Sequence, residues 1–170
     1  VQGKLEEAVD NLVKAIKFTE EDEKGQRTGF ALDARTRLAE LCQEIGRKRG
    51  RQTPKGLEYY RKAVEQRIEI NLYYDALLRR DRENKELRAK YYETLYDIYY
   101  VQYDSRDQDY MKNALRNVRI VLAMPNVPNK KAFKSLLADL ESLEWIRERG
   151  IDPYPARCRR THTTREAIDV

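Results

Sequence analysis

Apolar residues recur every three or four positions along most of this chain. The first such stretch contains Leu5, Ala8, Val9, Leu12, Ala15 and Ile16. The same spacing returns in LAELCQEI, which begins at Leu38, and in SLLADLESLEW, which begins at Ser135. This spacing is typical of α-helices that bury one face and leave the other in solvent. Alternation of apolar and polar residues, the mark of a strand, is absent from the sequence, so we predict an all-α fold.

Glycine, proline and short polar runs divide the pattern into separate helices. The breaks are the segment around Gly25 and Gly29, the basic loop GRKRGRQTP, the polar runs RDRENKE and DSRDQD, and MPNVPN. After the basic loop, Thr53 is expected to cap the next helix, with Pro54 in its first turn. In the polar runs, asparagine or aspartate can cap in the same way. We therefore predict six helices, at roughly 3–22, 30–48, 54–80, 85–104, 108–124 and 130–149.

The composition fits one helical domain without a membrane segment. Of the 170 residues, 37% are charged and 41% hydrophobic, as expected for helices with one buried face. No apolar run approaches the roughly 18 residues that a membrane span needs. We therefore expect a soluble, cytoplasmic protein, although the sequence itself does not name the compartment. Because the chain begins inside a helical pattern and without methionine, we interpret it as a piece of a larger protein.

Two patterns of small and large residues repeat along the chain. The first, small-large-small, occurs at Ala8, Leu12 and Ala15, at Gly56, Tyr60 and Ala63, and loosely at Met111, Leu115 and Val118. The second occurs at Leu38, Leu41, Cys42 and Ile45, and again at Tyr92, Leu95, Tyr96 and Tyr99. Small residues let two helices approach closely, and large ones fill the gaps between them. With these patterns the chain resembles a tetratricopeptide-repeat protein over about residues 1–124.

This resemblance implies a short right-handed α-solenoid of stacked antiparallel helix-turn-helix repeats. The repeat domain would span residues 1–149, with 130–149 as a capping helix, and an irregular basic and polar tail would follow at 150–170. The repeats are unusually long, because Leu38 and Tyr92 stand 54 positions apart, against a family period of about 34. Another α-solenoid or a helical bundle stays open as an alternative. So does packing of the capping helix against further repeats of the larger protein.

Tyrosine is concentrated in KYYETLYDIYYVQYD, residues Lys90–Asp104, which holds six of the twelve in the chain. Under the resemblance, four tyrosines fall on packing positions between helices: Tyr60, Tyr92, Tyr96 and Tyr99. Tyr96 is the least expected of these, because its position normally carries a small residue. The neighbouring tyrosines lie on adjoining faces, where they could contact a partner: Tyr59, Tyr91, Tyr100 and Tyr103.

The resemblance also implies a peptide-binding surface lined by the first helix of each repeat. Its positions in this sequence are Thr36, Ala39, Gln43 and Arg47, and then Lys90, Glu93, Asp97 and Tyr100. A clamp for a peptide's terminal carboxylate needs lysine and asparagine where this chain has Ala39, Gln43, Glu93 and Asp97, so we exclude that version. Because Glu93 and Asp97 stand one turn apart, we expect a partner that is basic or mixed in charge. A merely solvated face is the alternative.

Basic residues are concentrated in the segment Gly46–Arg67. It holds eight lysines and arginines against two glutamates, a net charge of +6 beside +5 for the whole chain. Its candidate anion-binding residues are Arg47, Lys48, Arg49, Arg51 and Lys55. Phosphates of a nucleic acid, an acidic protein or solvent alone could face these cations.

Patterns that carry catalysis or hold a metal are missing from the sequence. Cys42 and Cys158 form no metal-binding spacing, and His162 is the only histidine. We read Cys42 as a small core residue and expect no cofactor, no metal and no catalytic residues. The predicted function is a protein-protein interaction scaffold that binds a peptide or protein. A nucleic-acid-binding helical repeat and an assembly arm of a larger enzyme are the alternatives.

Overall fold

The computed structural model describes residues 2–22 and 29–148. Within these ranges the chain forms six α-helices and no strand: α1 (Gln2–Asp22), α2 (Gly29–Arg49), α3 (Pro54–Arg80), α4 (Lys85–Asp104), α5 (Gln108–Ala123) and α6 (Lys130–Glu148). The predicted all-α class is confirmed for the described part, and every predicted helix boundary agrees within one residue. The predicted tail at 150–170 lies outside the described residues.

Local capping explains where three of these helices begin. The side chain of Thr53 accepts a hydrogen bond from the amide of Gly56 at 3.0 Å, and that of Asn84 accepts one from Leu87 at 3.0 Å. Asp107 does the same for the first amides of α5. Each cap satisfies amides that a helix start leaves unpaired. The caps that the sequence predicts in the loop before α3 and in the two polar runs are therefore present.

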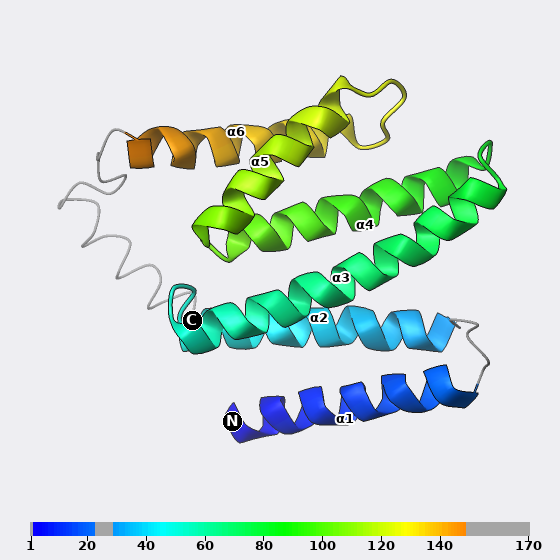
Figure 1. The fold of residues 1–170 in the computed structure, drawn as a ribbon, viewed down its shortest axis with the longest axis vertical. Coiled ribbons are helices and arrows are strands. Elements are labelled where there is room, and N and C mark those ends of the chain that lie inside the picture. The colour runs from blue at the N-terminus through cyan, green and yellow to red at the C-terminus, as the bar shows by residue number, and fades with distance from the viewer. Residues whose placement is uncertain (1, 23–28, 149–170) are drawn as a thin grey trace.

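The helices follow one another through the molecule in chain order (Figure 1). Each helix runs antiparallel to the next and packs against it, from α1 at one end to α6 at the other. Helix α3 packs against both α2 and α4. Helix α4 also touches α6, so the last three helices form a compact group.

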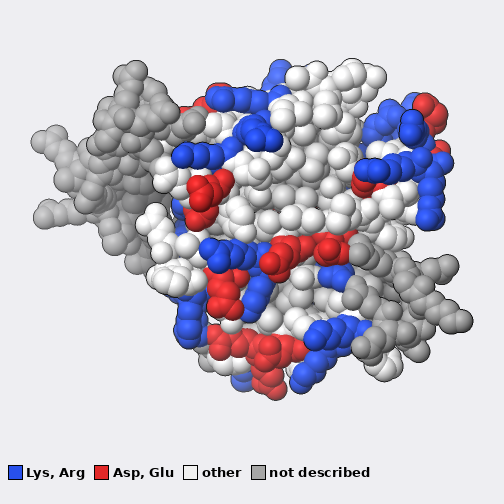
Figure 2. Space-filling view, viewed as in Figure 1, with Lys and Arg blue, Asp and Glu red and all other residues white. Residues whose placement is uncertain are grey.

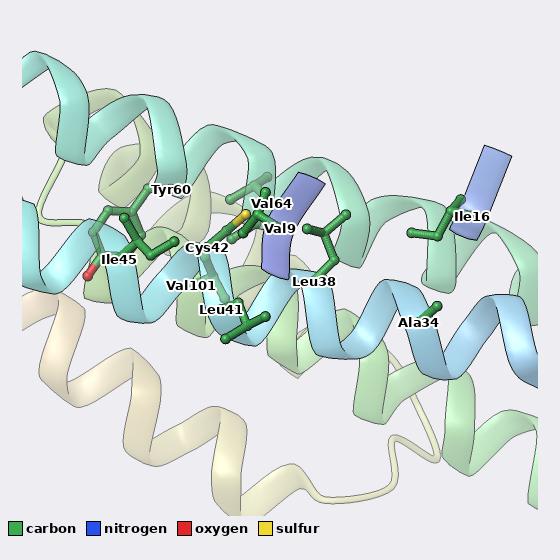
Figure 3. Close-up of a cluster of buried hydrophobic side chains, with 11 residues drawn as sticks. Val9, Ile16, Ala34, Leu38, Leu41, Cys42, Ile45, Tyr60, Val64 and Val101 are labelled. Carbon is green, nitrogen blue, oxygen red and sulfur yellow. The ribbon is translucent and has the colours of Figure 1, made fainter. Parts of the chain in front are cut away.

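The first of two buried clusters joins α1, α2 and α3, and Val101 of α4 completes it. Figure 3 shows these side chains gathered between the helices. Tyr60 and Cys42 are fully buried within the cluster. Burial raises the pKa of the Cys42 thiol to about 11, so the thiol stays protonated and behaves as a small apolar group. Its predicted place in the core is confirmed.

Two glycines allow α2 and α3 to approach closely beside Tyr60. A methyl group at Gly46 would lie 2.8 Å from the Tyr60 ring, and one at Gly56 would lie 2.0 Å from the carbonyl oxygen of Gly50. Both separations are shorter than van der Waals contact. Gly56 is the first small residue of the pattern that continues with Tyr60 and Ala63. The close approach that this pattern predicts is therefore present at the start of α3.

Replacing Gly56 with alanine is expected to lower the free energy of unfolding by about 1–3 kcal/mol, because the new methyl group overlaps backbone that cannot move aside cheaply. Urea denaturation followed by circular dichroism measures the change. Gly3→Ala is the matched control, since a methyl group there meets no atom within 4 Å. Equal stability of the Gly56→Ala variant and the control would contradict the close approach of α2 and α3.

The second buried cluster joins α4, α5 and α6. Phe133 is fully buried at its centre, and Tyr99 and Leu136 lie beside it in the core. Tyr96, at the position that normally carries a small residue, packs edge-on against Phe133 with ring centroids 5.5 Å apart. Tyr92 and Tyr96 are half-buried against the same cluster. The predicted packing role of these tyrosines is confirmed, and α6 supplies the space that Tyr96 needs.

Candidate partner-binding surfaces

A buried carboxylate at the end of α4 ties three helices together. Oδ2 of Asp104 accepts hydrogen bonds from Gln43 Nε2 at 2.7 Å, Arg47 Nε at 2.8 Å and the Tyr60 hydroxyl at 3.1 Å. Its other oxygen accepts from Arg51 Nη2 at 3.1 Å. The donors come from α2, from the loop after it and from α3. Asp104 is therefore the point where these elements meet α4.

The electrostatics of this cluster keep Asp104 ionised. Burial alone would raise the pKa of Asp104, but hydrogen bonds from Gln43 and Arg47, with the charges of Arg47 and Arg51, bring it below its ordinary value. The pKa of Tyr60 is raised to about 12 by burial and by the nearby charge of Asp104. The cluster thus holds a charged carboxylate in hydrogen bonds from α2, from α3 and from the loop between them.

Several residues of the predicted peptide-binding surface are engaged within the chain. Gln43 and Arg47 both donate to Asp104, and the hydroxyl of Thr36 donates to the carbonyl of Leu32 at 2.9 Å. Ala39 is fully buried. The part of the predicted surface that α2 contributes is thus largely used for packing.

The residues that α4 contributes to the predicted peptide-binding surface are more exposed to solvent than those of α2. Lys90 and Glu93 are exposed and pair with each other at 2.9 Å, while Asp97 binds Arg67 of α3 at 3.1 Å. Burial raises the pKa of Asp97, and the charges of nearby Glu93 and Glu40 add to this effect, although Arg67 opposes it. Glu93 and Asp97 thus each face a cation of the same chain, and the basic or mixed charge of the partner stays a prediction.

An aromatic row continues along the same face of α4. The Tyr96 ring stacks on Tyr100 at 6.1 Å, and Tyr100 lies 6.2 Å from Tyr103. The guanidinium of Arg106 covers the Tyr103 ring at 4.1 Å. Of the four tyrosines predicted to face outward, Tyr100 is exposed, and Tyr59, Tyr91 and Tyr103 are half-buried. Tyr100 is thus the most accessible member of the predicted partner-binding set on this row.

The candidate anion-binding cations mostly face carboxylates of the same chain. Arg47 and Arg51 bind Asp104, as described above. Arg49 pairs with Glu6, and Lys48 pairs with Glu44 at 2.6 Å. Lys55 lies close enough to lower the pKa of both Glu6 and Glu58. The positive charge of this segment is therefore largely balanced within the fold.

A different surface carries uncovered apolar side chains. Ile68 and Leu72, one turn apart on α3, are 39% and 50% exposed. Ile120 and Met124, one turn apart at the end of α5, are 47% and 41% exposed. Helices α3 and α5 each pack against α4, which separates them. Exposed apolar side chains can mark a protein-protein interface when they gather in a patch, so the two pairs are candidates for partner contact.

The start of α5 lies close to α3. Tyr110 of α5 lies near Arg61 and Glu65 of α3, whose charges act on its hydroxyl. Ile68 and Leu72 continue the stripe of Arg61 and Glu65 at i+3, i+4 and i+7 spacing. On α5, Ile120 lies about 80° around the helix from Tyr110, on the side opposite the buried stripe.

Helix α4 lies between α3 and α5 and packs against both (Figure 1). Figure 2 shows a broad uncharged surface over α4 and α5 on this side of the molecule, with charged side chains along its borders. Tyr92 of α4 contacts Met124, where its hydroxyl lies 3.8 Å from the sulfur. We refer to Ile68, Leu72, Ile120 and Met124 together as the exposed α3/α5 residues.

Reasoning from the sequence does not find the exposed α3/α5 residues. Their signal is present, since Ile68, Leu72 and Ile120 stand outside the stripes that bury α3 and α5. Such extra apolar positions are usually covered by a neighbouring helix, so the sequence alone does not mark them as exposed.

Comparison with family models, curated proteins and solved structures finds no match in any of the three. Among the described residues, no group of histidine, cysteine, aspartate and glutamate is placed to hold a metal ion. None of the described helices combines the length and apolar character that crossing a membrane requires.

Proposed function

We propose that this chain is a protein-protein interaction module that binds its partner through the exposed α3/α5 residues. One observation carries the proposal. Within residues 2–22 and 29–148, four of the six exposed large hydrophobic side chains belong to this set. Burying apolar surface is the main favourable term in association between proteins, so a partner gains most by binding there.

We further propose that the six helices are a short tetratricopeptide-like solenoid. The small-large-small pattern supports this arrangement, because Gly56 and Ala63 stand where α2 and α3 approach closely. In such a module the long helices would act as a rigid frame for the exposed α3/α5 residues. The nucleic-acid alternative gains no support from the described structure, since the cations that would carry it are paired with carboxylates.

Affinity capture from the source cells with the full chain as bait tests the proposed function. We expect the double variant Leu72→Glu/Ile120→Glu to lose partners that the wild type retains, because two carboxylates would have to be buried in an apolar contact. Both positions are about half exposed in the free chain, so the variant should fold normally by circular dichroism.

Two control variants locate the partner. Phe18→Glu adds the same charge to an exposed apolar residue of α1, and it should retain every partner. Glu93→Lys/Asp97→Lys reverses two carboxylates in the middle of α4. If this reversal releases the partners and the Leu72→Glu/Ile120→Glu variant retains them, the partner binds the α4 face and the assignment to the exposed α3/α5 residues is wrong.

A further inference from the structure

We infer that five cations where α2 turns into α3 bind an acidic segment of a partner protein: Arg47, Lys48, Arg49, Arg51 and Lys55. We call these five residues the basic α2–α3 site. The inference goes beyond the proposed function, because none of the exposed α3/α5 residues belongs to this site. Three properties support it: an excess of positive charge, guanidinium groups that are already held in place, and an exposed tyrosine beside them.

The cations of the basic α2–α3 site outnumber the carboxylates that they bind. Two of the arginines share one carboxylate, so the five cations bind only three within the described residues: Glu6, Glu44 and Asp104. Lys55 has no ion-pair partner among the described residues, and nearby Glu58 is already bound by Lys62 at 2.9 Å. Two positive charges are therefore left in excess, and they attract an anionic partner.

The guanidinium groups of Arg47 and Arg51 are held in place before a partner binds. Arg47 donates through Nε and Arg51 through Nη2, each to one oxygen of Asp104. A guanidinium carries five N–H groups, so each arginine has further donors to offer. The two side chains are 45% and 39% exposed, whereas that of Asp104 is 8% exposed. An approaching anion therefore meets ordered cations, and it loses less entropy than it would in ordering them itself.

The loop that carries the site is fixed by hydrogen bonds of its own. The Thr53 amide donates to the Gly50 carbonyl at 3.0 Å, and the Thr53 hydroxyl donates to the same carbonyl at 2.9 Å. The Gly50 carbonyl also lies against Gly56 at the start of α3. These contacts fix the path of the chain between Arg51 and Lys55, so the spacing of their charges is set in the free protein.

An aromatic side chain lies beside the arginines. Burial alone would lower the pKa of Arg47, but the hydrogen bond and charge of Asp104, with smaller contributions from Tyr60 and Tyr100, raise it above its ordinary value. Tyr100 is 40% exposed, so its ring is accessible next to this charged guanidinium. A ring beside a cation gives an apolar contact as well as a charged one, which suits a peptide segment better than a free inorganic ion.

The small excess of charge favours an acidic protein segment over a nucleic acid. Nucleic acids bind through many phosphate contacts at once, since duplex DNA carries one charge about every 1.7 Å. Most cations of the basic α2–α3 site are already engaged with carboxylates of the chain. A short segment with a few aspartates or glutamates matches the excess, and guanidinium groups bind such carboxylates through two parallel hydrogen bonds.

Fluorescence anisotropy with three labelled probes tests the inference on the full chain. The probes are a glutamate peptide, a lysine peptide and single-stranded thymidine DNA, each of about ten units, which in a peptide span about 35 Å when extended. Lys55→Glu reverses the cation that lacks an ion pair, in the first turn of α3, where a carboxylate suits the helix dipole. Arg47→Lys/Arg51→Lys keeps both charges and removes the planar guanidinium groups.

The matched control is Lys130→Glu, which makes the same change of charge at the exposed start of α6. Figure 1 shows the turn between α5 and α6 at the opposite end of the molecule from the turn between α2 and α3. A general effect of net charge would act equally in Lys130→Glu and Lys55→Glu, whereas a local site responds only to Lys55→Glu.

We expect the glutamate peptide to bind most tightly at low salt, with an affinity at least about tenfold weaker at about 0.3 M salt, where exposed charges are screened. Lys55→Glu should weaken binding at least about fivefold and Lys130→Glu less than about twofold. Arg47→Lys/Arg51→Lys should weaken it at least about threefold. Failure of the glutamate peptide to bind, equal losses in Lys55→Glu and Lys130→Glu, an unchanged affinity in Arg47→Lys/Arg51→Lys, or tighter binding of the DNA would each overturn the inference.

Discussion

Replacing Asp104 with alanine is expected to lower the free energy of unfolding by about 3–5 kcal/mol, as breaking one side of a buried ion pair does. The change removes the acceptor for Gln43, Arg47, Arg51 and Tyr60 at once. Tyr60 is fully buried, so its hydroxyl would be left without this partner in a water-poor site. Guanidinium denaturation measures the loss, and it should exceed the effect of any single donor substitution.

Tyr60→Phe is the matched control for Asp104→Ala, because it removes one hydrogen bond and keeps the packing of the ring. Its cost should be about 1 kcal/mol. A loss for Asp104→Ala no larger than this would show that the carboxylate does not join α2 and α3 to α4.

The pH dependence of stability gives a second test of Asp104. Its folded pKa lies below the ordinary value of 3.8, so its contribution is present above that value and is lost as the pH falls through the lower folded pKa. The wild type should therefore lose stability below about pH 4, and Asp104→Asn should lack this part of the loss. Parallel curves for both proteins would contradict an ionised, hydrogen-bonded Asp104.

Replacing Phe133 with alanine is expected to lower the free energy of unfolding by about 3–5 kcal/mol, as buried phenylalanines do. Phe133 is fully buried in the cluster of α4, α5 and α6, and its loss leaves a cavity beside Tyr96. The midpoint of guanidinium denaturation reports the change. Phe133→Leu keeps most of the volume and should cost less than about 1.5 kcal/mol. If alanine costs no more than leucine, α6 is not packed as described.

The helix boundaries could be predicted because the signals that set them are local. Thr53, Asn84 and Asp107 each cap a helix through an amide two or three residues away. The stripes of apolar residues are local as well. The close contact between helices at the start of α3 is also predicted by a local signal, because Gly56, Tyr60 and Ala63 lie within eight residues of one another.

The role of Asp104 and the exposure of the α3/α5 residues could not be predicted, because both depend on how distant segments pack. Asp104 lies 61 residues from Gln43 and 44 from Tyr60 along the chain. Its neighbourhood in the sequence, a polar run after a tyrosine-rich helix, indicates only a turn. Whether Ile68, Leu72 and Ile120 are covered depends on which helices pack beside α3 and α5, and neither helix encodes that alone.

Hydrogen bonds between residues that are distant in the sequence also explain why the sequence alone does not show what Gln43 and Arg47 bind. Gln43 and Arg47 stand at positions that the tetratricopeptide resemblance assigns to a peptide. In the structure their side chains bind Asp104 instead. The basic segment has a net positive charge when it is counted alone, and its carboxylate partners Glu6 and Asp104 come from helices outside it.

Site-specific photo-crosslinking in the source cells tests the role of the exposed α3/α5 residues most directly. A photoreactive phenylalanine analogue at Leu72 stands on α3 at a position that is 50% exposed, and the same analogue at Phe18 stands on α1 at an apolar position that is 69% exposed. We predict a discrete covalent adduct with a partner protein from position 72 and none from position 18. An adduct from position 18 with none from position 72 would contradict the assignment of the exposed α3/α5 residues as the partner-binding surface.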